Sequence, residues 1–75
     1  MQRKSINYVY SKVGQRIINA RSEKGISQEK LATDSGVDRS HVGFIEQGRR
    51  RPTLATLFKL TRALDISLEQ LFKDL

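Results

Sequence analysis

The sequence predicts an all-α fold, namely one compact domain of five short helices. Three observations support this prediction. Apolar residues recur three and four positions apart, the spacing at which side chains share one face of a helix. Strand signals are poor, because the chain has no alternating apolar run and no Asn-Gly or Asp-Gly hairpin turn. Finally, 75 residues without a cysteine allow a single small core and no disulfide.

The first helix is marked by its apolar spacing. Val9, Val13 and Ile17 lie four positions apart, and Ala20 follows three positions later. Gly25 is expected to end this helix, because glycine readily adopts the left-handed conformation that often follows a helix.

Three of the later helices begin at a residue whose side chain can cap them, namely Ser27, Asp38 and Ser67. Such a side-chain oxygen accepts a hydrogen bond from a backbone N–H of the first turn, which has no partner within the helix. For the fifth helix, Ser67 and Gln70 have the spacing of a capping box. The expected helices run from Ser27 through Asp34, from Asp38 to Gly48, from Pro52-Thr53 through Leu64, and from Ser67 onward.

Apolar residues beside these caps are expected to join the core. A residue before the cap can pack against one at the end of the first turn, an arrangement called a hydrophobic staple. The pairs with this spacing are Ile26 with Leu31, Val37 with Val42, and Ile66 with Leu71. The fourth helix is expected to contribute Leu54, Leu57, Leu60 and Leu64.

Positive charge is concentrated in the first two thirds of the chain. The sequence has 14 Lys and Arg against 8 Asp and Glu, a net charge of +6, and a pI near 10.2. Residues 1–51 hold 11 basic and 5 acidic residues, whereas residues 52–75 hold 3 of each. We expect residues 1–8 to form a basic N-terminal arm before a domain of residues 9–75. This charge is typical of proteins that bind a nucleic acid or an anionic membrane surface, although some small basic domains are simply soluble and have no such partner.

The composition argues against several classes of function. No apolar run approaches the roughly 20 residues that a membrane span needs, and the N-terminus lacks the apolar stretch of a signal peptide. We therefore expect a cytoplasmic protein with no membrane partner. His41 is the only histidine and there is no cysteine, so neither a metal ion nor another cofactor is expected. An enzyme would need convergent catalytic groups in a cleft, so no enzymatic activity is expected.

A helix-turn-helix unit is indicated at residues 28–47. Counted from Gln28, the fifth, ninth, fifteenth and eighteenth residues are Ala32, Gly36, Val42 and Ile45. Ala32 lies where two helices cross at roughly 90–120°, and a larger side chain would push them apart. Gly36 lies in the turn, where a positive φ favours glycine. An ordinary pair of packed helices needs the same core residues, but it does not explain the exposed face of the third helix or the basic excess around it.

A resemblance to a known family rests on the stretch ISQEKLATDSGVDRSHVGFIEQGRRRPTLATLFKLTRAL. This stretch resembles the phage-repressor and Cro type of helix-turn-helix domain, also called the xenobiotic-response-element family. The run from Ile45 to Leu57 matches that family's I-E-x-G-x-R-x-P-T-L-x-T-L pattern. The D-R-S-H-V stretch is also similar to restriction–modification controller proteins, small dimers without a ligand-binding domain. The resemblance covers about residues 9 to 73 and implies a lambda-repressor-like DNA-binding fold.

The resemblance implies roles for residues of the second and third helices. Gln28 would bind a DNA phosphate and brace the third helix. The third helix would lie in the major groove and present Arg39, Ser40 and Phe44 to base edges. An arginine can bond guanine O6 and N7, whereas Phe44 would contact a thymine methyl group or not touch the DNA. His41 would contact a phosphate or remain a neutral surface group.

Two further roles follow from the same resemblance. Arg49, Arg50 and Arg51 would pass the DNA backbone and act mainly as phosphate clamps, where the alternative is a solvated loop. Arg50 matches the arginine of the family's G-x-R-x-P element. Arg21 of the first helix would pair with Glu46 and so hold the first helix against the third.

The implied function is that of a sequence-specific regulator of transcription that binds double-stranded DNA as a homodimer on a palindromic operator. Such a regulator would act on its own gene, would fit a restriction–modification controller, and would need no small-molecule ligand. Two alternatives remain open, namely an antitoxin-type or other partner-binding module and the DNA-binding fragment of a larger repressor. The surface through which the two copies meet is expected in the C-terminal third. It would be a stripe of apolar residues along the fifth helix, called here the dimer stripe, unless these residues belong to the core. They are Leu68, Leu71, Phe72 and Leu75.

Overall fold

Five α-helices account for most of residues 5–75, the part of the chain that the computed structural model describes, and these residues contain no strand. The helices are α1 (Ile6–Lys24), α2 (Gln28–Ser35), α3 (Arg39–Glu46), α4 (Leu54–Leu64) and α5 (Leu68–Phe72). The predicted all-α fold with five helices is therefore confirmed.

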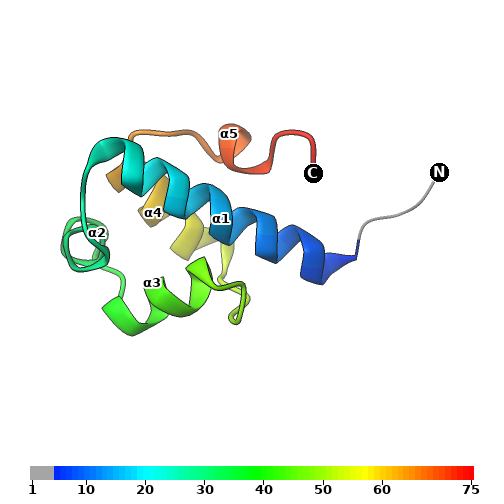
Figure 1. Cartoon of the computed structure of the whole chain (residues 1–75), viewed down its shortest axis with the longest axis horizontal. Coiled ribbons are helices and arrows are strands. Elements are labelled where there is room, and N and C mark those ends of the chain that lie inside the picture. Colours follow the sequence, from blue (N-terminus) through cyan, green and yellow to red (C-terminus); the bar gives the residue numbers. More distant parts are fainter. Residues whose placement is uncertain (1–4) are drawn as a thin grey trace.

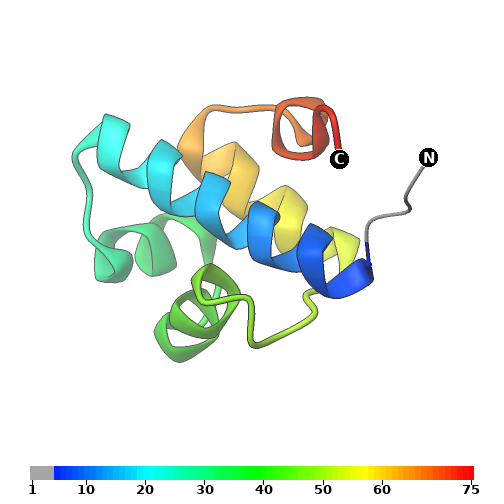
Figure 2. The same cartoon turned by 45° about the vertical axis from the view of Figure 1, so that its right-hand side comes forward.

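The helices pack around one core (Figure 1). The longest helix, α1, packs against α3, α4 and α5, while α2 packs against α3 and α4. α3 and α5 lie on opposite sides of the α1–α4 pair, as Figure 2 shows from a second angle. This arrangement places α3 at one edge of the domain, and none of the other four helices covers its outer face.

α1 begins at Ile6, earlier than the apolar spacing predicts. Ser5 caps the helix, because its side-chain oxygen accepts a hydrogen bond from the Tyr8 N–H at 3.1 Å. Residues 6–8, which were predicted to belong to an N-terminal arm, are therefore helical, and residues 1–4 of that arm lie outside the described residues. At the other end Gly25 has a φ of 72° and ends the helix as predicted.

The caps predicted at Ser27, Asp38 and Ser67 are present, and Thr53, which was predicted only as the start of the fourth helix, caps α4. In each of them the side-chain oxygen accepts a hydrogen bond of 3.0 to 3.1 Å from a backbone N–H of the first turn. Gln70 Oε1 also accepts from the Ser67 N–H at 2.8 Å, which completes the predicted capping box. The capping residues are Ser27 for α2, Asp38 for α3, Thr53 for α4 and Ser67 for α5.

Side chains from all five helices form the core. The buried apolar residues are Val13, Ile17, Leu31, Ala32, Val37, Val42, Ile45, Leu57, Leu60, Leu64 and Leu71. All members of the three predicted staples either belong to this core or pack against it. The local patterns beside the helix caps therefore identified core residues correctly.

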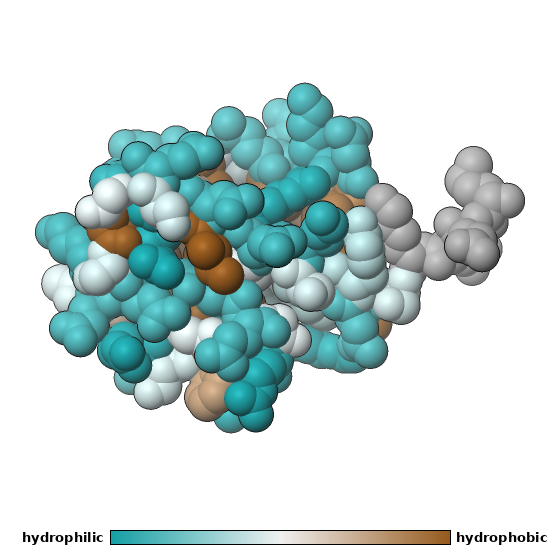
Figure 3. Space-filling model, in the orientation of Figure 1, coloured by the Kyte–Doolittle hydropathy of each residue, from teal (hydrophilic) through white to brown (hydrophobic). Residues whose placement is uncertain are grey.

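Leu54 is the exception among the predicted core residues of α4, because it is 64% exposed. Side chains of a helix point toward its N-terminus, so the first residue of α4 projects past the end of the helix. The other exposed large apolar residues of the described chain are Ile6, Tyr8 and Phe58. The face drawn in Figure 3 is mostly hydrophilic. Within residues 5–75, no helix has both the length and the apolar character to span a bilayer.

α5 is held to the core by Leu71 and by an arginine of α1. Leu71 is fully buried, so it cannot belong to the predicted dimer stripe, while Leu68, Phe72 and Leu75 pack partly buried against the core. Arg16 Nη1 donates a hydrogen bond to the Leu71 carbonyl oxygen at 3.1 Å. Because the last carbonyl groups of a helix have no partner within it, this arginine caps the C-terminal end of α5.

Candidate nucleic-acid interface

α2 and α3 form a helix-turn-helix whose turn is closed by local hydrogen bonds. Gly36 follows α2 with a φ of 76°, and its N–H donates to the Ala32 carbonyl oxygen at 2.9 Å. Ser35 Oγ accepts a hydrogen bond from the Val37 N–H at 3.2 Å. Ala32 and Gly36 thus have the positions that the spacing predicts, and the turn sets the direction in which α3 leaves α2.

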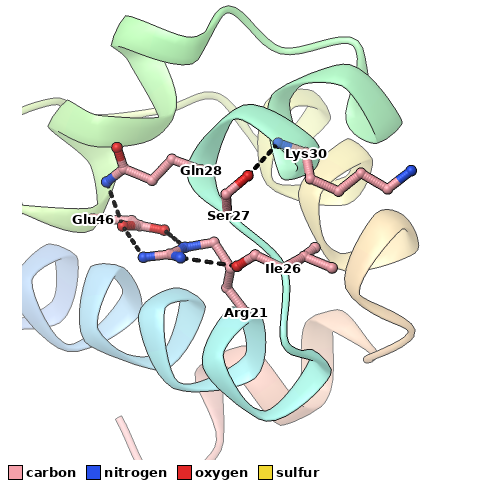
Figure 4. Close-up of polar contacts among 6 residues, drawn as sticks. All are labelled: Arg21, Ile26, Ser27, Gln28, Lys30 and Glu46. Atoms are coloured by element: carbon pink, nitrogen blue, oxygen red, sulfur yellow. Dashed lines mark hydrogen bonds and ion pairs between the residues drawn. The ribbon is translucent and has the colours of Figure 1, made fainter.

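A buried ion pair fixes α3 against α1 and α2 (Figure 4). Glu46, the last residue of α3, is 6% exposed. Arg21 of α1 donates to its carboxylate through Nε at 2.8 Å and through Nη2 at 3.2 Å, which makes the contact bidentate. Arg21 Nη1 also donates to the Ile26 carbonyl oxygen at 3.0 Å and so holds the connection between α1 and α2. The predicted pairing of Arg21 with Glu46 is confirmed.

Gln28 connects α2 to the ion pair between Arg21 and Glu46. Its Nε2 donates to Glu46 Oε1 at 2.8 Å, so the predicted bracing of α3 by Gln28 is confirmed. Because the amide NH₂ group must face the carboxylate, the second N–H of Nε2 is the donor that remains for another partner. The contact of Gln28 with a DNA phosphate stays a prediction.

The uncovered face of α3 bears two shallow hollows that share a wall. The first hollow, of about 230 Å³, is lined by Gln28, Arg39, Ser40, Gly43, Phe44 and Gln47. The second, of about 300 Å³, is lined by Asp38, Ser40, His41, Phe44 and Arg50. Ser40 and Phe44 line both hollows and therefore form the wall that the hollows share. The structure thus brings together six of the predicted site residues, whereas Arg49 and Arg51 line neither hollow.

Arg39 is an exposed side chain in the first turn of α3. Its Nε lies 4.0 Å from Glu29 Oε1, and the two side chains are 59% and 80% exposed. An ion pair this long between exposed side chains contributes little to stability. The guanidinium group can therefore exchange this contact for another acceptor at small cost.

Phe44 supports two of the three arginines that follow α3. The guanidinium carbons of Arg49 and Arg50 lie 5.5 Å and 5.1 Å from the centroid of its ring. Cations within about 6 Å of an aromatic face are attracted to it, so the half-buried ring holds both exposed cations beside α3. From the sequence, Phe44 was expected to contact a thymine methyl group or not to touch the DNA, and its position beneath these two arginines was not predicted.

Arg51 differs from its two neighbours because it is directed to α1. Its Nη2 donates to Asn7 Oδ1 at 3.0 Å, and its guanidinium carbon lies 5.7 Å from the Tyr10 ring. These contacts connect the first turns of α1 to the loop of residues 47–53. The structure therefore divides the arginine run, which the sequence prediction treated as one cluster, into two supported by Phe44 and one tied to α1.

The helix-turn-helix family pattern matches residues 17–71, which is most of the chain. The chain belongs to the helix-turn-helix family. Its similar proteins are transcriptional regulators rather than enzymes. Its membership of the helix-turn-helix family therefore makes this protein a regulator of transcription, as the sequence predicts.

Several relatives that match most of this helix-turn-helix chain are control proteins, and two of the similar solved structures are controllers of restriction–modification systems. Control protein C.MunI from a Mycoplasma species is 34% identical over 71 residues, which cover 93% of this chain and 96% of that protein. The crystal structure of the controller C.AhdI from Aeromonas hydrophila is 49% identical with a TM-score of 0.81, over 84% of this chain and 96% of that one. The controller C.Esp1396I was crystallised as a tetramer with its natural 35 base-pair operator. That chain is 35% identical with a TM-score of 0.80, over 93% of this chain and 95% of that one. The predicted similarity to controllers is confirmed.

Four residues that line the first hollow or contact the loop arginines were not identified from the sequence. Gly43 and Gln47 line the first hollow, and Asn7 and Tyr10 hold Arg51. Gly43 and Gln47 could have been found from helical spacing, because they lie three and four positions after residues already assigned to the exposed face. The contacts of Asn7 and Tyr10 join distant parts of the chain, and no local pattern indicates them.

Proposed function

We propose that this helix-turn-helix regulator binds a specific sequence of double-stranded DNA and controls transcription from it. The observation that carries the proposal is the uncovered face of α3. On it Arg39 and Ser40 lie exposed in the first turn, and Arg50 lies beside Phe44. The Glu46 contacts hold this face in a fixed position relative to α1 and α2. A rigid helix with exposed donors and adjacent basic groups is suited to the major groove.

The proposed DNA contacts are of two kinds, namely contacts that recognise base edges and contacts that bind phosphates and position the protein. Arg39 reads a guanine through its two parallel donors, and Ser40 bonds a neighbouring base edge. Arg49 and Arg50, supported by Phe44, bind phosphates, as does Gln28 through its second N–H. His41 lies at the edge of the second hollow and contacts a phosphate. Arg51 is left out of this set, because its position beside Asn7 favours a structural role.

The regulator acts as a homodimer on a palindromic operator. One α3 helix reads few base pairs, and a two-fold dimer places two of them in half-sites roughly 34–36 Å apart. The crystallised C.Esp1396I tetramer on its operator supports assembly on DNA. Two chains of net charge +6 approach with least repulsion through residues 52–75, which carry no net charge. Leu54, the most exposed large apolar residue described, lies in this segment and is proposed to meet the second copy.

The regulated genes are proposed to be a restriction–modification system and the regulator's own gene. The support is the similarity to C.MunI, C.AhdI and C.Esp1396I over nearly the full length of each of those proteins. Occupancy of the operator then depends on the concentration of the regulator, since a dimer that assembles on DNA responds steeply to protein concentration. A reporter joined to the region upstream of its own gene should change its output as the regulator is titrated. A constant output would contradict autoregulation.

Binding to DNA is tested with duplexes selected from a random pool and scrambled versions of the same composition. Fluorescence anisotropy should give an affinity for the selected duplex that is about 10³-fold or more above that for scrambled DNA. Both affinities should fall as the salt concentration rises. Equal affinity for the two duplexes at every salt concentration would contradict sequence-specific binding.

A further inference from the structure

Gly43 lies in the interior of α3, at a position where the backbone conformation does not require a glycine. It lies in a regular helical stretch, Arg39–Glu46. The glycines with a positive φ in the described chain are Gly25, Gly36 and Gly48, and each lies at the end of a helix. A glycine inside a helix lowers its stability relative to alanine, because the unfolded chain loses more freedom on folding. The conformation of α3 therefore offers no reason for glycine at this position.

Packing offers no reason for it either. A Cβ atom on Gly43 would have Gln28 Oε1 and Nε2 as its nearest neighbours, at 3.8 Å and 3.9 Å, which are ordinary contact distances. Gly14 shows the opposite situation, because a Cβ atom there would collide with the carbonyl oxygens of Ile45 and Glu46, the latter at 2.7 Å. Gly14 is thus needed for the close approach of α1 to α3. Gly43 could carry a methyl group without disturbing the fold.

What Gly43 does is leave space in the first hollow. The hollow, of about 230 Å³, is also lined by hydrogen-bond donors, namely the Arg39 guanidinium, the Ser40 hydroxyl and the amide groups of Gln28 and Gln47. Gly43 supplies the part of the wall that has no side chain. Glycine is the residue that permits a ligand to approach a backbone closely.

We propose that Gly43 is a contact position for DNA, at which a nucleotide of the operator approaches the backbone of α3. The donors around the hollow fit an acceptor oxygen of the DNA, either a phosphate oxygen or the acceptor edge of a base. This inference rests on the proposed function and adds a residue to it. The helix is less stable with glycine than with alanine, and the access that glycine gives to DNA explains its presence.

The test is Gly43→Ala in the full chain, measured for both stability and DNA binding. Thermal unfolding should give a Tm that is higher by roughly 2–8 °C, because alanine favours the helix. Affinity for the selected operator should fall by a factor of about ten or more, because the methyl group occupies the contact position. A structural role would move the two quantities in the same direction. A loss on operator and scrambled DNA alike identifies a phosphate as the contact, and a loss confined to the operator identifies a base edge.

The control is Ser22→Ala, which lies on the exposed side of α1. This change should also raise the Tm through helix propensity, but it should leave DNA affinity unchanged. An affinity of Gly43→Ala within twofold of the wild type would overturn the inference, as would a lowered Tm, which would show that packing requires the glycine. In both cases the wild type still prefers its operator and the proposed function stands. A wild-type chain that binds both duplexes equally would instead contradict the proposed function.

Discussion

Replacing Glu46 by glutamine is predicted to destabilise the whole domain. Glutamine has nearly the same size but no charge, so Arg21, whose side chain is only 19% exposed, would lose its counter-ion. Removing one partner of a buried pair costs about 3–5 kcal/mol, and the partial exposure of Arg21 places the cost near 3 kcal/mol. A core of this size supplies only about 3–5 kcal/mol in total. Glu46→Gln should therefore populate the unfolded state near room temperature.

The assay is urea unfolding followed by far-ultraviolet circular dichroism. The unfolding midpoint should fall while the slope m stays constant, because the surface exposed on unfolding is unchanged. Lys30→Ala is the matched control. It removes the ion pair of Lys30 with Asp34, whose 3.1 Å contact is largely exposed, and should cost less than about 0.5 kcal/mol. A loss below about 1 kcal/mol for Glu46→Gln would refute the reasoning that this contact holds α1, α2 and α3 together.

The loop arginines and the dimer surface lead to two further predictions. Arg50→Ala should reduce the salt slope of DNA binding by about 1 per protomer, whereas Arg51→Ala should leave it unchanged and lower the Tm, because Arg51 bonds Asn7. Equal salt slopes for the two variants would contradict the assignment of Arg50 to a phosphate and of Arg51 to a structural role. Leu54→Glu should keep the helical circular dichroism spectrum of the wild type, because the side chain is 64% exposed, yet sediment as a monomer where the wild type is a dimer. A Leu54→Glu dimer of unchanged affinity would show that the copies meet elsewhere.

The local parts of this structure could be predicted from the sequence. Ser27, Asp38, Thr53 and Ser67 cap their helices because the interaction involves residues only two or three positions apart. Buried positions such as Leu31 follow from the helical spacing, since one face of each helix must meet the core. Signals confined to a few neighbouring residues are sufficient for features of this kind.

The features that were missed depend on contacts between distant parts of the chain. Arg51 is directed to Asn7, 44 positions away, so the run of three arginines gave no indication of its different orientation. Arg16 caps α5 from the middle of α1, across 55 positions. Leu54 has the spacing of a core residue but lies at the end of α4, where burial depends on the neighbouring elements and not on the helix itself. Only the packed structure decides such positions.

The measurement that tests the reading role of α3 most directly is the binding of Arg39→Ala to operator and to scrambled DNA over a range of salt concentrations. If Arg39 bonds a guanine, its loss should lower affinity for the operator by about 1–3 kcal/mol and relax the preference at one base pair of each half-site. Affinity for scrambled DNA should change little by comparison. An equal loss on both duplexes, with a reduced salt slope, would show that Arg39 binds a phosphate and would contradict the assignment of base reading to this residue.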